Sequence, residues 1–176
     1  EVEGKEATLM LARDILLDEK TPYLDKLILL IAPIFNADGN ERINPDNRRQ
    51  QPGPEQGAGV RHNGQTLDLN RDSMKLESPE LVGLVENVLN RWDPLLLVDC
   101  HTTNGSYHRE PVTYTTCANA NAPKALTDYM WKKLFPAAAA TLKKEAGYES
   151  VAYGEFVDGA NPSKGWINEA IEARYG

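Results

Sequence analysis

Two short stretches of the sequence combine residue types that can do chemistry. The first ends an apolar run and carries Asp99 and His101, two residues apart. In an extended strand both side chains face the same way, so the carboxylate can orient the imidazole or lie behind it. His101 is then either a metal ligand or catalytic base, or a core histidine satisfied by hydrogen bonds. For Asp99 the alternative is a cap on a local turn or an ion pair with an arginine.

The second stretch is residues 68–72, with sequence DLNRD, in which Asn70 stands beside Arg71. A guanidinium fork next to an amide suits bidentate binding of a carboxylate. The alternative is a surface ion pair, for example between Arg71 and Asp72 or Glu77. The residue types alone leave both interpretations open.

A long polar segment, from residue 36 to about residue 66, precedes this stretch. Loops of that length inside compact domains are unusual and are often functional, and the alternative is a disordered insert. Val60 and Leu67 reconnect the segment to a core. Two of its arginines, Arg48 and Arg61, would extend the carboxylate clamp for a negatively charged substrate end.

The elements that must position these residues follow from hydrophobic spacing and start signals. Helices are expected over residues 4–18, 79–92, 123–134, 137–142 and 161–171, with Pro136 interrupting the third helical stretch. Buried strands are expected at 27–35 and 95–101, a short strand at 112–114, and a strand or loop at 148–159.

Strands that alternate with helices predict an α/β fold, a doubly wound mixed sheet with helices on both faces. The 95–101 strand would deliver His101 to its carboxyl end, where open α/β sheets bind ligands. Cys100, inside that strand, is expected to be a small buried hydrophobic residue. Because only three or four strands are evident, we expect the sequence to lack part of a larger domain.

Composition narrows the class of protein. The 176 residues are 41% hydrophobic and 26% charged, which suits one globular core. A net charge of −7 argues against nucleic acid or an anionic membrane as the main partner. The two cysteines imply no disulfide framework, and no apolar run is long enough to span a membrane. The compartment stays open, with a periplasmic or secreted location favoured over a cytoplasmic one.

In four ordered places the chain resembles the zinc metallocarboxypeptidase family, the carboxypeptidase A type. Residues 1–7 (EVEGKEA) resemble the family's His-x-x-Glu-x-x-Gly-x-Glu segment, beginning at the first glutamate of that segment. Residues 36–39 (NADG) resemble the Asn-Pro-Asp-Gly turn, with alanine in place of proline. Residues 68–71 (DLNR) match the Asp-Leu-Asn-Arg signature, and residues 97–101 (LVDCH) resemble the strand that ends in the third metal ligand.

Carried over position by position, the resemblance implies a zinc cofactor held by Glu1 and His101. Asn70 and Arg71 would grip the terminal carboxylate of the substrate. Arg61 would polarise the scissile carbonyl.

The resemblance also gives less direct assignments. Arg48 is the reserve for the role of Arg61, and Tyr153 is the substrate-covering tyrosine, with Tyr148 and Tyr107 as competitors. His62 and His108 are expected to be solvated or at the substrate's edge, since neither has ligand spacing to His101.

Two departures from the family pattern matter. The first zinc-binding histidine would lie three residues before Glu1, outside this sequence. The general base, a glutamate on a late strand in the family, has only Glu169 and Glu172 as candidates, and both lie in a helical pattern. We therefore expect residues 1–176 to be a single partial peptidase domain, truncated at both ends, that binds zinc poorly and is inactive by itself.

The function expected of the whole enzyme is zinc-dependent removal of C-terminal residues from peptides. One alternative is a zinc amidase or deacylase that acts on acylated amino acids or cell-wall peptides. Another is a non-catalytic module that retains the carboxylate clamp. The expected partner is a peptide or peptide-like substrate with a free carboxylate.

Overall fold

A computed structural model describes residues 2–17, 21, 24–49, 54–102, 109–117, 119 and 121–153. The chain divides into two compact units, Glu1–Leu69 with Val98–Ser106, and Asn70–Leu97 with Tyr107–Gly176. We call them unit 1 and unit 2. The secondary structure is mixed and mostly helical, with one small two-stranded parallel sheet in the described part. None of the described helices is both long and apolar enough to cross a membrane.

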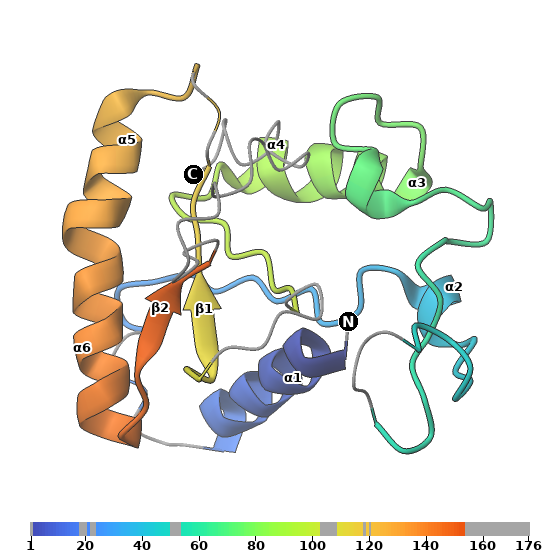
Figure 1. Ribbon diagram of the computed structural model, residues 1–176. Coiled ribbons are helices and arrows are strands. Elements are labelled where there is room, and N and C mark those ends of the chain that lie inside the picture. Colours follow the sequence, from blue (N-terminus) through green and yellow to red (C-terminus); the bar gives the residue numbers. More distant parts are fainter. Residues whose placement is uncertain are drawn as a thin grey trace, which may run out of the picture. The chain divides into compact units, whose positions relative to one another are not determined.

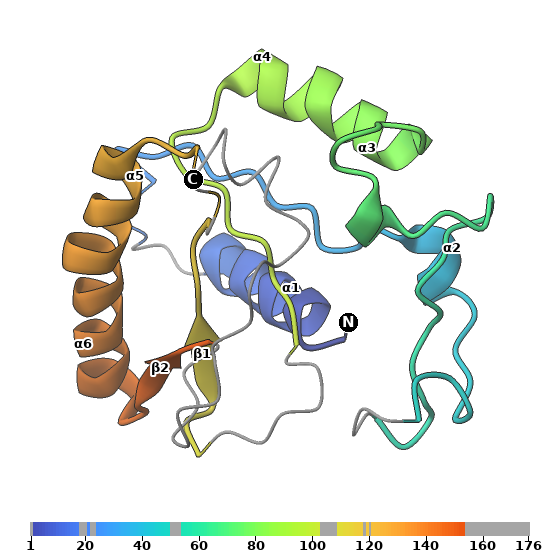
Figure 2. The same ribbon diagram turned by 45° about the horizontal axis from the view of Figure 1, so that its top comes forward.

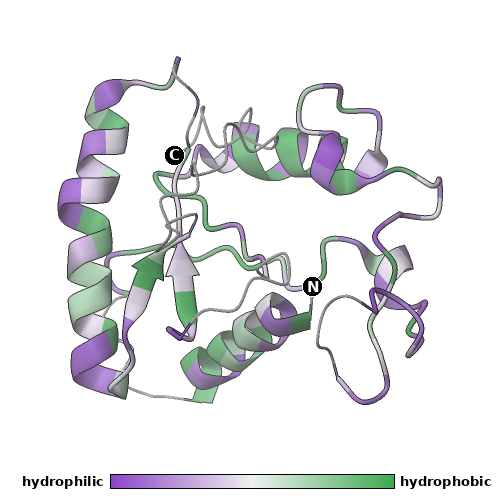
Figure 3. Ribbon diagram, in the orientation of Figure 1, coloured by the Kyte–Doolittle hydropathy of each residue, from purple (hydrophilic) through white to green (hydrophobic). Residues whose placement is uncertain are grey.

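The described part of unit 1 contains two α-helices, α1 (Val2–Leu17) and α2 (Ala37–Asn40). The first confirms the helix expected over residues 4–18, and Glu3 lies exposed in its first turn. Polar and apolar residues both line α1 in Figure 3, and its apolar side chains stay accessible, with Leu16 83% exposed. The helix α2 begins where Asn36 caps it, since Asn36 Oδ1 accepts a hydrogen bond from the Gly39 N–H at 2.9 Å.

In unit 2 a continuous helix follows the 3-10 turn η1 (Leu69–Arg71). It comprises α3 (Pro79–Leu84), the π turn η2 (Val85–Leu89) and α4 (Asn90–Trp92). Ser78 Oγ accepts from the Leu81 N–H at 3.3 Å, which confirms the expected serine cap. The helix buries Leu81 and Leu89 and ends at Asp93, which adopts a left-handed conformation with φ of 43°.

The rest of the described part of unit 2 is one strand–helix–strand unit. Strand β1 (Val112–Tyr114) pairs in parallel with β2 (Ser150–Ala152), and the connecting helix lies beside both strands in Figure 1 and Figure 2. The helix comprises α5 (Lys124–Tyr129), the π turn η3 (Met130–Leu134) and α6 (Phe135–Ala146). Its aromatic residues pack on β1, since the ring centroids of Phe135 and Tyr114 are 4.5 Å apart. Burying such rings fixes the helix on the sheet.

The expected interruption at Pro136 is wrong. The helix continues past this proline, which occupies the first turn of α6 directly after the π turn. The Phe135 N–H bonds to the Met130 carbonyl, five residues back. Because proline is tolerated in the first turn of a helix, a change of hydrogen-bonding pattern just before Pro136 accommodates it without a break.

The buried strands expected at 27–35 and 95–101 are also corrected. Neither segment is a strand in the structure, and most of their apolar side chains are exposed, with Ile28 at 75% and Leu95 at 99%. Cys100 is exposed as well, against the expectation that it is buried. An apolar run favours burial only when other elements cover it, and in the structure these side chains stay open to solvent. The helix expected at 161–171 lies outside the described residues.

Candidate functional site

A tight turn in unit 1 brings Arg61 and Asp68 together. The Asn63 N–H donates to the Leu67 carbonyl at 3.0 Å, and the neighbouring residues His62 and Asp68 form an antiparallel bridge. Two chain segments therefore run side by side from this turn. We call residues 61–68 the arginine hairpin.

The side chain of Asn63 holds the arginine hairpin in shape. It is 1% exposed, and its Oδ1 accepts hydrogen bonds from the Gln65 N–H at 3.0 Å and the Leu67 N–H at 2.9 Å. Such a side-chain bond to the following backbone substitutes for part of a strand ladder. Sequence reasoning did not identify this residue, although the dipeptide Asn63-Gly64 is a strong turn signal.

The guanidinium of Arg61 is held by a carboxylate across the hairpin. Its Nη1 lies 3.1 Å from Asp68 Oδ2, and the two side chains are 33% and 19% exposed. A half-buried charge pair is screened less by water than a surface pair. Arg61 is therefore held at its charged end, while a third of its side chain stays accessible to solvent.

The turn before α2 docks onto this hairpin through its backbone and side chains. Asn36 Nδ2 donates to the Arg61 carbonyl at 3.0 Å, and the Gly64 N–H donates to Asp38 Oδ2 at 2.8 Å. The Val60 N–H bonds to the Gly39 carbonyl at 3.0 Å. The predicted NADG turn and the predicted Arg61 thus form one hydrogen-bonded assembly.

Glycine is required where these backbones meet. A Cβ on Gly59 would lie 2.2 Å from the Gly39 carbonyl oxygen, and one on Gly39 would lie 2.4 Å from the Val60 carbonyl oxygen. Both approaches are far inside van der Waals contact. The chain can cross at this point only because neither residue has a side chain.

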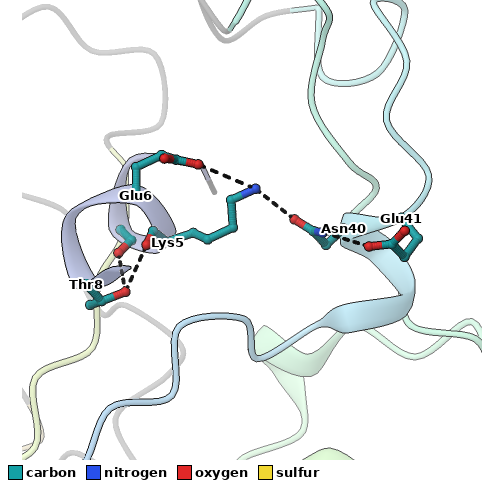
Figure 4. Close-up of polar contacts among 6 residues, drawn as sticks. Lys5, Glu6, Thr8, Asn40 and Glu41 are labelled. Atoms are coloured by element: carbon teal, nitrogen blue, oxygen red, sulfur yellow. Dashed lines mark hydrogen bonds and ion pairs between the residues drawn. The ribbon is translucent and has the colours of Figure 1, made fainter. Parts of the chain in front are cut away.

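The start of α1 contacts two other parts of unit 1. Lys5 Nζ donates to Asn40 Oδ1 at 3.1 Å and lies 3.8 Å from the Glu6 carboxylate, as Figure 4 shows. A Cβ on Gly4 would lie 2.6 Å from the Cβ of Cys100. The glycine of the predicted EVEGKEA motif therefore lets the segment that carries Asp99 and His101 approach the helix closely.

His101 and Asp99 contact each other. The His101 Nε2 lies 3.0 Å from Asp99 Oδ2, and their side chains are 40% and 54% exposed. Such a contact is what an orienting role of Asp99 requires, and the role itself stays a prediction. With Nε2 on the carboxylate, a metal ion would have to be bound through Nδ1, in the arrangement that carboxylate-backed histidine ligands adopt.

The described residues include no group of three histidine, cysteine or carboxylate side chains placed to hold a metal. Glu1, the second predicted zinc ligand, lies outside the described residues. So do Glu169, Glu172, Tyr107 and His108. The donors present fit one imidazole ligand of a zinc site with its supporting carboxylate, and not a complete site.

The other predicted site residues belong to different units, and each is described within its own unit. Arg48, in unit 1, is half-buried in a loop closed by hydrogen bonds to Ala58 and has a left-handed φ of 52°. In unit 2, Asn70 is half-buried in η1 and Arg71 is exposed, with its Nη1 donating to the Asn70 carbonyl at 2.6 Å. Tyr153 follows β2, and its N–H donates to the Tyr114 carbonyl at 2.8 Å.

Tyr148, the alternative to Tyr153, and His62 both lie at the surface. Tyr148 is 56% exposed, and His62 is exposed as the sequence predicted.

Comparison of the chain with protein-family models, with curated proteins and with solved structures gives no match.

Proposed function

We propose that this chain belongs to a zinc-dependent hydrolase that removes C-terminal residues from peptides. The observation that carries the proposal is the fixed, half-buried guanidinium of Arg61, 3.1 Å from Asp68 and anchored through its own carbonyl by Asn36. A cation held in this way is suited to bind an oxygen on which negative charge accumulates. The four motifs in their order support the same proposal.

In this proposal Arg61, Arg48 and Arg71 divide two tasks between them. Arg61 stabilises the oxyanion that forms when water attacks the scissile carbonyl, and Arg48 is its reserve. Asn70 and Arg71 bind the free carboxylate of the substrate and so fix which bond is cleaved. Tyr153 covers the bound substrate.

Glu1 and His101 would hold the metal, with Asp99 orienting the imidazole. Bound zinc would supply a Lewis acid and a water of lowered pKa. The Asp99 contact also fixes which ring nitrogen of His101 points away from the carboxylate. That is the contribution to the metal site for which the described residues give geometry.

A doubly wound mixed sheet with helices on both faces is the fold we propose for the enzyme domain. The parallel pair β1 and β2, joined by a helix, supports it because such strand–helix–strand units build these sheets. Amide infrared spectroscopy tests this directly. The fold proposal requires far more strand than the 3 residues each of β1 and β2, and a spectrum that accounts for those alone contradicts it.

The function is tested with a matched pair of ligands, an N-acylated dipeptide with a free carboxylate and its C-terminal amide. We expect calorimetry, with zinc present, to show about tenfold or more tighter binding of the free acid, since the amide loses charge-assisted hydrogen bonds. Arg71→Met should weaken this preference. Equal binding of acid and amide by the unaltered chain contradicts the proposal.

Turnover of the same ligands separates the competing functions. Release of the C-terminal residue from the acid alone supports a carboxypeptidase. Hydrolysis of both ligands, or of an acylated single amino acid in preference, indicates an amidase or deacylase. Selective binding of the acid without hydrolysis of either ligand indicates a carboxylate-binding module.

A further inference from the structure

Two polar side chains hold Arg61 from opposite ends. Asn36 bonds to its backbone and Asp68 to its guanidinium. We propose that Asn36 and Asp68 are positioning residues, which set the place and direction of the Arg61 guanidinium and thereby the selectivity of the site for an anionic ligand. This inference rests on the proposed function and deepens it, because it has Arg61 extend the clamp for the free carboxylate of the ligand in addition to its task at the oxyanion.

The oxygen and the nitrogen of the Asn36 side-chain amide make different hydrogen bonds. Its Oδ1 accepts from the Gly39 N–H at 2.9 Å and so caps α2, while its Nδ2 donates to the Arg61 carbonyl at 3.0 Å. Capping alone does not require an amide, because aspartate or serine caps a helix as well as asparagine. The donor end is the part that needs asparagine, and its hydrogen bond goes to the residue that carries the guanidinium.

Asp68 fixes the other end of Arg61. It contacts the guanidinium through Nη1, which leaves the N–H groups of Nε and Nη2 for a ligand, because arginine carries five such donors. The Asp68 side chain is 19% exposed, so little of the carboxylate faces water. The partly buried carboxylate therefore restricts Arg61 to one orientation without using all of its donors.

Holding an arginine in place before the ligand arrives strengthens binding. A free arginine side chain loses rotamer entropy when it is immobilised, and a side chain that is already fixed does not lose it again. The effect falls on ligands that bind the guanidinium. A neutral ligand, which contacts it weakly, should gain little.

Three variants test the inference with the acid and amide dipeptides. Asn36→Asp keeps the oxygen that caps α2 and removes the N–H that reaches Arg61. Asp68→Asn keeps an oxygen acceptor and removes the charge. Asp14→Asn is the matched control, because Asp14 forms an aspartate–arginine pair with Arg13 at 2.8 Å on the exposed surface of α1, outside the site.

We expect Asn36→Asp and Asp68→Asn to weaken binding of the free acid about three- to tenfold while binding of the amide stays within about twofold. Asp14→Asn should change neither. Urea unfolding of each variant shows whether the fold is retained. A merely structural role would weaken acid and amide alike, so the acid-to-amide ratio separates positioning from stability.

The outcomes also separate this inference from the proposed function. If the unaltered chain prefers the acid and both site variants keep that preference in full, the positioning roles are wrong and the function stands. If the unaltered chain shows no preference, the function and the inference both fail. Asn36→Asp provides the sharper test, since it keeps an oxygen that can accept from the Gly39 N–H and removes the donor to the Arg61 carbonyl.

Discussion

Replacement of Asp72 by asparagine should destabilise unit 2 strongly. The Asp72 side chain is 4% exposed and accepts three hydrogen bonds, from the Glu77 N–H at 2.8 Å, the Ser78 N–H at 2.7 Å and the Ser78 hydroxyl at 2.6 Å. Ser78 in turn caps α3. The carboxylate thus organises the turn that starts the helix.

The magnitude follows from counting donors. Asparagine can turn its single oxygen toward the two donors of Ser78, but its NH2 group then faces the Glu77 N–H, which loses its acceptor. One buried donor without a partner costs about 1–3 kcal/mol, and the two remaining bonds lose their charge assistance. We expect a total loss of about 2–4 kcal/mol in the free energy of unfolding.

The loss should depend on pH. Burial alone would raise the pKa of Asp72, but the hydrogen bonds from Ser78 and Glu77 and the charge of Lys75 outweigh it and lower this pKa below its ordinary value of 3.8. A lowered pKa in the folded state means that the carboxylate stabilises the fold above pH 3.8. This stabilisation disappears as the pH falls through the folded-state value, so unaltered chain and variant should converge in strong acid.

The assay is urea unfolding followed by tryptophan fluorescence in a Trp166→Phe background. This background leaves Trp92 and Trp131, the two tryptophans that the structure describes, as the probes of unit 2. We expect the midpoint of Asp72→Asn to fall by about 1 M or more at pH 7. Asp128→Asn is the control, since Asp128 pairs with lysines on an exposed helix face. A loss for Asp72→Asn no larger than the control, or a difference that does not shrink in acid, refutes the reasoning.

Three further predictions concern unit 1 and the thiols. Thr66 has a left-handed φ of 64°, which is costly for a β-branched residue, so Thr66→Gly should raise the free energy of unfolding by about 0.5–1 kcal/mol in urea titrations, and a loss would contradict the strain. Gly59→Ala places a Cβ 2.2 Å from the Gly39 oxygen and should lower the melting temperature by several degrees, with an unchanged value refuting the close contact. Of the two cysteines, exposed Cys100 should react with a thiol reagent in the native protein and buried Cys117 only after unfolding, and equal rates would contradict their placement.

The helices could be predicted because their signals are local. Ser78 followed by proline fixes the start of α3, and Pro123 stands directly before α5, so a few consecutive residues suffice. The β1 strand was recognised from Val112 and Tyr114. The predicted helix interruption at Pro136 is wrong because a proline by itself does not indicate the π turn that precedes it.

The segments at 27–35 and 95–101 could not be predicted in the same way. Their apolar residues signal a preference for burial, yet burial depends on what packs against them, which is a long-range property. Ile28 and Leu95 remain largely exposed in the structure. Hydropathy indicates that a residue favours burial, but it does not indicate whether other elements of the fold pack against that residue.

The candidate site was predicted in its parts but not in its connections. The family resemblance assigns both Arg61 and the NADG turn from short motifs. That Asn36 bonds to the Arg61 carbonyl and that Asp68 contacts its guanidinium follows from pairings across 25 and 7 residues. No periodic pattern in the sequence predicts such side-chain contacts.

The turn at Asn63 also affects how the protein ages. An asparagine followed by glycine is prone to deamidation, because the glycine nitrogen can attack the side-chain amide and glycine offers no steric hindrance. Here the Gly64 N–H is held by Asp38 and the Asn63 amide oxygen is held by two backbone N–H groups. The folded hairpin therefore keeps the reacting groups apart, and mass spectrometry of stored protein should find deamidation at Asn63 only after the chain has been unfolded.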